Sequence, residues 1–148
     1  MATINSILNQ AMNLRQDIDR LLRASSYYQF DDLSGLEIDY EDSEQLFLLD
    51  ELRGVMERLA DVEDTLRYIA QPVLETARLR KNASGRYETP GGRYFCCGNL
   101  IEALVSDSRH DTAYWTLTSV EYNGEDYCLA GHRDVPMSGL TIRIKKAL

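Results

Sequence analysis

Three cysteines and one histidine are the side chains of this sequence best suited to bind a metal ion. Cys96, Cys97, Cys128 and His132 would together supply three thiolates and one imidazole, a ligand set that zinc accepts. Cys96 and Cys97 are adjacent, so in a strand their side chains point to opposite faces and cannot both reach one ion without a bulge. The separated thiol pairs of a zinc ribbon are absent, and an odd cysteine count does not suit a disulfide framework. We expect free thiols, no metal and no cofactor.

A second candidate for chemistry is the run Ser108-Arg109-His110-Asp111, which holds the side-chain types of a nucleophile, a base and an orienting acid. A catalytic triad needs a base oriented by a third group and a fixed oxyanion site. Four consecutive loop residues do not supply that geometry. The glycines at positions 91, 92 and 98 serve turns and form no phosphate-binding loop after a strand. We therefore predict no catalytic residues and a protein that is not an enzyme.

Aromatic side chains form a third candidate, a groove for peptide or protein binding of the kind that barrel domains line with aromatic rings. The candidate groove residues are Tyr87, Tyr94, Tyr114, Tyr122 and Tyr127. An alternating strand places Trp115 and Leu117 on one face and Tyr114, Thr116 and Thr118 on the other. In the alternative interpretation Trp115 belongs to the core and the tyrosines are ordinary surface residues.

The fourth candidate is an acidic segment that could contact a basic partner. Between residues 31 and 51 there are nine acidic residues and no basic one. The candidate contact residues are Asp31, Asp32, Glu37, Asp39, Glu41, Asp42 and Glu44. Rows of carboxylates can imitate nucleic-acid phosphates. In the alternative interpretation the segment is a solvated connector, with Tyr28, Phe30, Leu36 and Ile38 packed back on neighbouring helices.

Two helical segments flank this acidic connector. The first, about residues 5–24, has apolar residues alternating in steps of three and four, the narrow stripe of a coiled coil: Ile4, Ile7, Ala11, Leu14, Ile18 and Leu21. The second has the same spacing at Leu48, Leu52, Val55, Leu59, Val62, Leu66, Ile69 and Val73, with Asp42 or Ser43 as its cap. Pro72 should kink or restart the helix, which we expect to continue to about Arg80.

Two such helices joined by a connector of about 18 residues predict an antiparallel hairpin whose two stripes face each other. A hairpin of this size buries little, so the helices are candidates for self-association as a homodimer.

The rest of the chain consists of short β-rich runs separated by turn residues. We expect strands at 86–88, 93–96, 100–105, 114–122, 126–129 and 140–144, with residues 81–85 as the linker from the helices. Asn123-Gly124 is the strongest hairpin signal, because both positions tolerate the positive φ of a type I′ turn. In the last strand Leu140, Ile142 and Ile144 should face inward and Thr141 and Arg143 outward. The pattern predicts a small all-β barrel or sandwich.

Composition and charge limit the class of partner. The chain has 148 residues and a net charge of −8, of which residues 1–84 carry −7. A net acidic chain does not suit direct nucleic-acid binding, which relies on Lys and Arg. No apolar run reaches the ~18 residues of a membrane span, and the N-terminus does not resemble a secretory signal. We expect a cytoplasmic protein without membrane contact that binds another protein.

The C-terminal part, about residues 85–147, resembles an uncharacterised family of small domains from Firmicutes, often carried on conjugative and other mobile elements. The resemblance depends on structural motifs: Gly85-Arg86-Tyr87-Glu88, Gly92-Arg93-Tyr94-Phe95, Cys97-Gly98-Asn99-Leu100-Ile101-Glu102, Tyr114-Trp115, Val120-Glu121, Asn123-Gly124 and 139–144. It implies an SH3-like barrel and no established activity. Because members of the family are carried on mobile elements, the resemblance also suggests a role in interference with host defence.

The sequence thus predicts an α+β protein: a coiled-coil-like antiparallel helical hairpin over residues 1–80, followed by a small SH3-like β-barrel over residues 85–148. The predicted function is a non-enzymatic protein-interaction or regulatory module of a mobile genetic element. The alternative is an inhibitor of a host-defence nucleic-acid enzyme, of the anti-CRISPR or anti-restriction type, acting by acidic mimicry of DNA.

Overall fold

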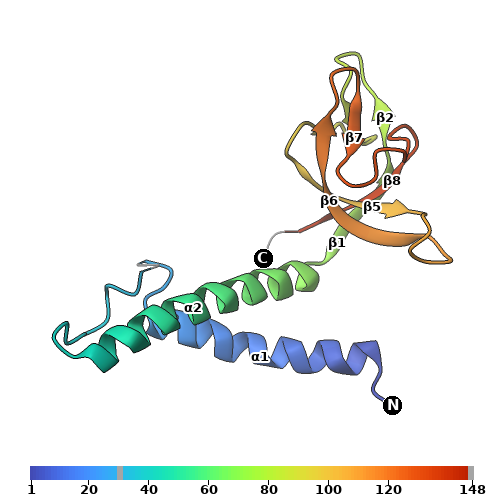
Figure 1. Cartoon of the computed structure of the whole chain (residues 1–148). Coiled ribbons are helices and arrows are strands. Elements are labelled where there is room, and N and C mark those ends of the chain that lie inside the picture. The colour runs from blue at the N-terminus through green and yellow to red at the C-terminus, as the bar shows by residue number, and fades with distance from the viewer. Residues whose placement is uncertain (30–31, 147–148) are drawn as a thin grey trace. The chain divides into compact units, whose positions relative to one another are not determined.

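A computed structural model describes residues 1–29 and 32–146 of the chain. The chain divides into two compact units (Figure 1). The helical unit comprises residues 1–71, and the β unit begins at Pro72. None of the helices in the described residues is long and apolar enough to cross a membrane.

The helical unit contains α1 (Ile4–Ala24) and α2 (Ser43–Ala70). Thr3 caps α1 in a capping box, because its hydroxyl accepts from the Ser6 N–H while the Ser6 hydroxyl accepts from the Thr3 N–H. Asp42 caps α2, accepting from the N–H groups of Glu44 and Gln45, so the predicted cap is confirmed. Both helices therefore begin where a side-chain oxygen can satisfy free backbone donors.

The end of α2 corrects the predicted boundary between the units. The helix ends at Ala70, and Val73–Arg78 is strand β1 rather than a helical continuation to Arg80. Gln71 adopts an extended backbone, the conformation that a residue before proline favours. The units therefore divide between residues 71 and 72, and not in the predicted linker at 81–85, which includes part of strand β2 (Arg80–Lys81).

The two helices pack antiparallel, as predicted, but with a different face from the predicted one. Leu22 near the end of α1 clusters with Leu49 and Met56 of α2, and Arg15 lies level with Glu63 further along. In the predicted stripes Leu14 is 58% exposed and Val62 is 45% exposed. Most of the packing residues lie one residue further along each helix, but Ile18, Leu59 and Leu66 of the predicted stripes are also buried or half-buried. The prediction that these stripes face each other therefore holds only in part.

The connector packs part of its own side chains on the helices. Leu33 is fully buried in the same cluster, and Leu36 and Ile38 pack against it, so this part of the prediction is confirmed. Tyr28 is half exposed and bonds to Asp19 instead. Phe30 and Asp31 lie outside the described residues.

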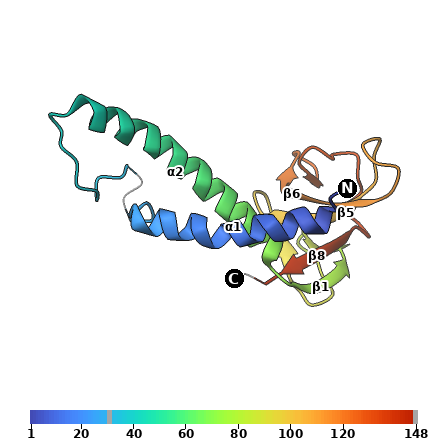
Figure 2. The same cartoon turned by 90° about the horizontal axis from the view of Figure 1, so that it is seen from below.

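The β unit contains short antiparallel strands, several of them within the predicted runs. They are β1 (Val73–Arg78), β2 (Arg80–Lys81), β3 (Tyr87–Glu88), β4 (Tyr94–Phe95), β5 (Leu100–Val105), β6 (Tyr114–Tyr122), β7 (Tyr127–Leu129) and β8 (Thr141–Lys145). One sheet has five strands in the order β1-β8-β5-β6-β7, and the other has three in the order β2-β3-β4. The α+β class is confirmed, with antiparallel sheets after the helices (Figures 1 and 2).

The core of the β unit lies on one face of the five-stranded sheet. Ile101, Ala103 and Val105 of β5 are buried there, and so are Ile142 and Ile144 of β8. Leu140 is buried too, which confirms the predicted inward residues of the last strand.

The alternation along β6 is as predicted, but its core face is the opposite one. Tyr114 packs against the core, whereas Trp115 lies half-buried under the guanidinium of Arg143, which is 4.4 Å from the centre of the indole ring. The interpretation that Trp115 is a core residue was therefore wrong. The expected hairpin connects β6 to β7 with four residues, and only Gly124 takes a positive φ, of 96°.

Candidate functional site

The tyrosines predicted from the sequence do not form one groove, but two of them contact the same arginine and a third packs on one of these two. Arg86 lies over the ring of Tyr94 at 5.2 Å. A side-chain hydrogen bond with Tyr127 raises the pKa of Arg86 above its ordinary value. The rings of Tyr127 and Tyr122 are 5.0 Å apart. We call this set, Arg86, Tyr94, Tyr122 and Tyr127, the tyrosine–arginine patch.

The patch is accessible and carries a positive charge. Tyr94 is 51% exposed and Tyr122 is 52% exposed, while Arg86 and Tyr127 are half-buried. Tyrosine rings next to an arginine supply large rigid contact area together with hydrogen-bond donors, the composition that recurs at the centres of protein interfaces.

Tyr87 belongs to the support of this patch and not to its surface. Its ring is buried in the core, and its hydroxyl donates to Asp126 at 2.9 Å. Burial is the main reason why the pKa of Tyr87 is raised. The hydrogen bond from Tyr87 is the main reason why the pKa of Asp126 is lowered, and Lys81 pairs with the same carboxylate at 3.3 Å. Tyr87 thus anchors the residue that precedes Tyr127.

Tyr114 lies in a separate polar cluster with Asp107. Its hydroxyl donates to Asp107 at 2.7 Å, which lowers the pKa of that carboxyl and raises the pKa of Tyr114. His132 Nδ1 is 3.6 Å from the same carboxylate, and the ring of His110 packs edge-on against Tyr114. Asp107 and Tyr114, which the sequence reasoning did not join to these histidines, therefore organise the loop that contains Ser108 and His110.

The three cysteines are free and differ in burial. Cys128 is buried, Cys97 is exposed, and Cys96 is half-buried with its thiol 3.4 Å from the Asn99 side-chain oxygen. Within residues 1–29 and 32–146, no group of three or more His, Cys, Asp or Glu side chains is placed to hold a metal ion.

The acidic connector has two kinds of carboxylate. Asp39 and Asp42 stabilise the backbone, since Asp39 accepts from the Glu41 N–H and Asp42 caps α2. Asp32 accepts from the Ser34 N–H, which is the main reason why its pKa is lowered. By contrast, Glu37, Glu41 and Glu44 are exposed and make no side-chain ion pair in the part of the chain that the structure describes. Asp31, the remaining predicted contact, lies outside that part.

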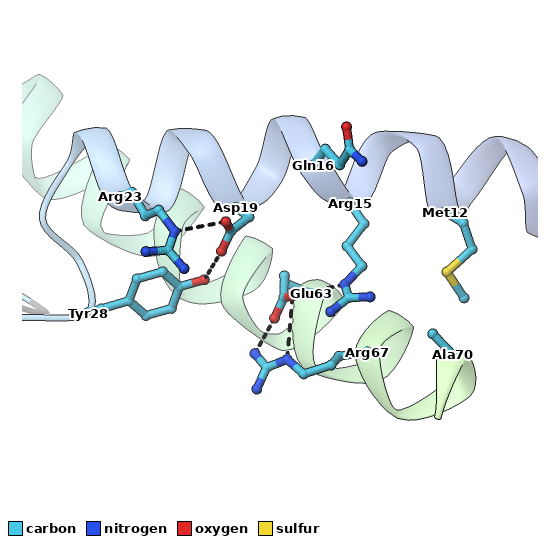
Figure 3. Close-up of a pocket in the computed structure, with 9 residues that line it drawn as sticks. All are labelled: Met12, Arg15, Gln16, Asp19, Arg23, Tyr28, Glu63, Arg67 and Ala70. Carbon is cyan, nitrogen blue, oxygen red and sulfur yellow. Dashed lines mark hydrogen bonds and ion pairs between the residues drawn. The ribbon is translucent and has the colours of Figure 1, made fainter. Parts of the chain in front are cut away.

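A pocket of about 860 Å³ lies between the helices, and ion pairs line it (Figure 3). Glu63 of α2 is buried and bonds to both Arg15 and Arg67. The hydrogen bond from Arg67 is the main reason why the pKa of Glu63 is lowered. Asp19 bonds to Arg23 at 2.8 Å and to the Tyr28 hydroxyl at 3.1 Å. All three arginines therefore have carboxylate partners, and the Arg15–Glu63 pair joins α1 to α2.

Arg86 and the buried carboxylates Glu63 and Glu102 were not predicted as functional or structural residues from the sequence. The only sequence feature that marked Arg86 was its place between Gly85 and Tyr87 in a strand-forming run. Its neighbours Tyr94 and Tyr127 come close to it only through the turns of the β unit, which the sequence pattern does not show. Glu102 had a clearer signal, because a charged residue stands alone inside the apolar run 100–105.

Comparison with known proteins identifies the C-terminal part. Residues 76–144 form a DUF5348 domain, described as a domain of unknown function. The matched region begins within β1 and ends within β8, so it includes residues 76–78 of the strand that was predicted to be helical. No curated protein and no solved structure matches the chain.

Proposed function

We propose that the chain is a non-enzymatic protein-interaction module and that the tyrosine–arginine patch of the DUF5348 domain is its binding surface. The observation that carries the proposal is the cluster of Tyr94, Arg86 and Tyr127, extended by Tyr122, with two rings half exposed. A protein segment crossing these rings would cover aromatic surface and could place a carboxylate or carbonyl oxygen on Arg86.

The rigidity of the patch supports this role. Tyr87 and Asp126 fix the chain next to Tyr127, and Arg86 is held on both sides by tyrosines. Preformed aromatic contacts lose little conformational entropy on binding. We further propose that the domain is of the SH3-like type, whose members bind peptides through aromatic grooves. The assignment to a mobile genetic element, and to the cytoplasm, depends on the family resemblance and the composition.

A displayed library of random peptides tests the binding surface without knowledge of the natural partner. Peptides enriched on the full chain should lose at least about tenfold in affinity, or about 1.4 kcal/mol, for Tyr94→Ala and for Tyr122→Ala, because tyrosines are enriched among the few interface residues that carry most of the binding energy. Tyr40→Ala is the matched control, since Tyr40 is a 62% exposed tyrosine of the helical unit. Failure to enrich any peptide, or equal binding by all three variants, would count against the patch.

Pull-down from a Firmicute lysate then identifies the natural partner, and the same variants measure its affinity. The affinity of the partner should depend on Tyr94 and Tyr122 in the same way as the affinity of the peptides.

The second candidate is inhibition of a host-defence nuclease by the acidic connector. It is favoured by the exposed Glu37, Glu41 and Glu44, whose carboxylates make no ion pair among the described residues. Its test is inhibition of DNA cleavage by restriction and RNA-guided nucleases, at low and high salt. Glu37→Gln, Glu41→Gln and Glu44→Gln together should weaken inhibition and change stability by less than about 1 kcal/mol, because these three side chains are exposed whereas Asp39 and Asp42, which hold the backbone, are kept. Salt-insensitive inhibition that survives the triple change would eliminate mimicry.

A further inference from the structure

The faces with which α1 and α2 pack on each other are defined by burial. These buried or half-buried residues recur in steps of three and four: Leu8, Met12, Arg15, Asp19 and Leu22 in α1, and Leu49, Arg53, Met56, Ala60, Glu63 and Arg67 in α2. Much of this face is polar, because Arg15, Glu63 and Arg67 form ion pairs within it. The contact inside the helical unit is therefore only partly apolar.

A second stripe on each helix is apolar and largely exposed, although Ile18, Leu59 and Leu66 within it are buried or half-buried. In α1, Ile7, Leu14 and Leu21 each stand one residue before Leu8, Arg15 and Leu22. In α2, the same offset relates Leu48, Val55 and Val62 to Leu49, Met56 and Glu63. One residue is a rotation of about 100° around a helix. On both helices the apolar stripe is thus turned by the same amount and in the same sense from the packing face.

Because the helices run antiparallel, this equal rotation brings the two stripes to the same side of the pair. Antiparallel packing follows from the contacts, since Leu22 meets Leu49 and Met56 whereas Arg15 meets Glu63 (Figures 1 and 2). The result is one apolar face, which we define by its exposed members: Ile4, Ile7, Leu14, Leu21, Leu48, Leu52, Val55, Val62 and Ile69. Their exposures range from 38% to 84%.

This face is large enough for a stable interface. A standard protein–protein interface buries about 800 Å² on each partner. Nine large apolar side chains at these exposures offer an area on the order of that value, and monomeric proteins rarely leave so large an apolar patch in water. None of the nine is charged, so burying these side chains removes no charged group among them from water.

We propose that the apolar face packs on the same face of a second copy of this chain to form a four-helix bundle. The heptad spacing of both stripes is the spacing that packs knobs into holes on other helices, which favours a helical partner over a sheet or an extended peptide. A second copy presents two helices with the identical spacing, and a two-fold axis makes one such face complementary to itself. The polar packing face then lies inside each copy, and the apolar face forms the core between copies.

Dimer formation would give the protein two binding surfaces. If the tyrosine–arginine patch binds a protein segment, as proposed above, the dimer presents two patches. A partner with two such segments would then bind more tightly than a partner with one. The dimer itself depends only on the helical unit.

Sedimentation equilibrium of the full chain tests the proposal. The expected mass is twice that of the 16.9 kDa chain at micromolar concentration. Leu14→Glu with Val55→Glu should give a single chain with helical circular dichroism retained, since both residues are exposed within one copy. Leu100→Glu is the matched control, because Leu100 is a 67% exposed leucine of the β unit, and it should leave the dimer intact.

A second measurement covers the case in which the double variant fails to fold. In the full wild-type chain, the melting temperature of the helical unit should rise with protein concentration, because association stabilises the folded state by mass action. A wild-type chain that stays a single copy, with a melting temperature independent of concentration, would overturn the proposal. So would a dimer that survives Leu14→Glu with Val55→Glu. Peptide binding by the single-copy variant would show that the tyrosine–arginine patch works independently.

Discussion

Glu63 is almost wholly buried between two helices, where the guanidinium groups of Arg15 and Arg67 hold it in its charged form. A buried ion pair contributes modestly to stability, because the carboxylate loses its hydration, but its geometry selects one arrangement of the chain. Arg15 meets Glu63 in only one alignment of α1 on α2. We infer that this network fixes the register of α1 on α2. The apolar residues recur every three and four positions, so apolar packing alone would also allow one helix to slide by one turn along the other.

The lowered pKa of Glu63 predicts an acid dependence of the helical unit. A carboxyl whose folded pKa lies below its ordinary value of 4.5 stabilises the fold above that pH, and this contribution is lost as the pH falls through the folded pKa. Glu63→Gln keeps the size and removes the charge. Its free energy of unfolding should be about 1–2 kcal/mol lower than that of the wild type near neutral pH, and the difference should shrink below about pH 4.

Urea unfolding followed by circular dichroism at several pH values measures this difference. Glu57→Gln on the exposed side of α2 is the control and should follow the wild type. A constant gap between Glu63→Gln and the wild type at all pH values would mean that the carboxylate charge is not what stabilises the helix pair.

Glu102 plays the corresponding part in the β unit, where it is 6% exposed and pairs with Arg143 and Lys145 of the neighbouring strand. Glu102→Ala would leave two cations without this carboxylate in a largely buried place, so it should lower the stability of the β unit by about 3 kcal/mol. The chain has a single tryptophan, Trp115, under Arg143, and its fluorescence in denaturant measures the unfolding of this unit. Glu125→Ala, in the exposed β6–β7 turn, should change stability by less than about 0.5 kcal/mol. Equal effects of the two changes would refute the structural role of Glu102.

At the scale of elements, the sequence predicted what local chemistry determines. Asp42 caps α2, the runs at 100–105 and 114–122 are strands, and Leu140, Ile142 and Ile144 face the core. It failed at β1, because Pro72 was taken to begin a further helical piece. The residues Val73–Arg78 gain strand structure from long-range pairing with β8, some 65 residues later, which local spacing does not reveal.

The candidate site was less predictable than the fold for the same reason. The tyrosines could be named from the sequence, but which of them meet depends on the turns, and the structure joins Tyr94, Tyr122 and Tyr127 while it buries Tyr87 and separates Tyr114. The heptad stripes were also identified correctly as apolar. The surface that each stripe contacts was not identified correctly, because two adjacent stripes on one helix can both recur in steps of three and four.

The place of β1 predicts which fragments of the chain can fold. This strand pairs with β8 through residues 73–78, and Leu79 immediately after it is 2% exposed in the core. A fragment that begins at Pro72 should fold, whereas one that begins at Gly85 lacks an edge strand and a core leucine and should not. Trp115 fluorescence and the dispersion of amide signals in nuclear magnetic resonance spectra distinguish the two. A folded fragment from Gly85 onward would show that β1 is dispensable.

At the scale of the whole molecule, two surfaces of different chemistry serve different contacts. The apolar face of the helical unit suits a second copy, and the tyrosine–arginine patch suits a segment of another protein. The acidic residues lie mostly in residues 1–84, so a dimer of the helical units brings together two strongly negative regions. The apolar contact must therefore overcome charge repulsion. Added salt weakens the repulsion but not the apolar contact, so the salt dependence of the dimer distinguishes the two forces.

We predict that the proposed dimer becomes tighter, or stays unchanged, when salt is added. Each chain carries a net charge of −8, and added salt screens the repulsion between copies over about 8 Å at physiological ionic strength. Hydrophobic contact between the apolar faces does not weaken under these conditions. Sedimentation equilibrium at about 0.05 M and about 0.5 M sodium chloride measures the dissociation constant on each side of that ionic strength. The dissociation constant should not rise at the higher concentration, whereas association through ion pairs between carboxylates and arginines would weaken steeply with salt. A dimer that dissociates in high salt would therefore locate the contact in the charged residues and not in the apolar face.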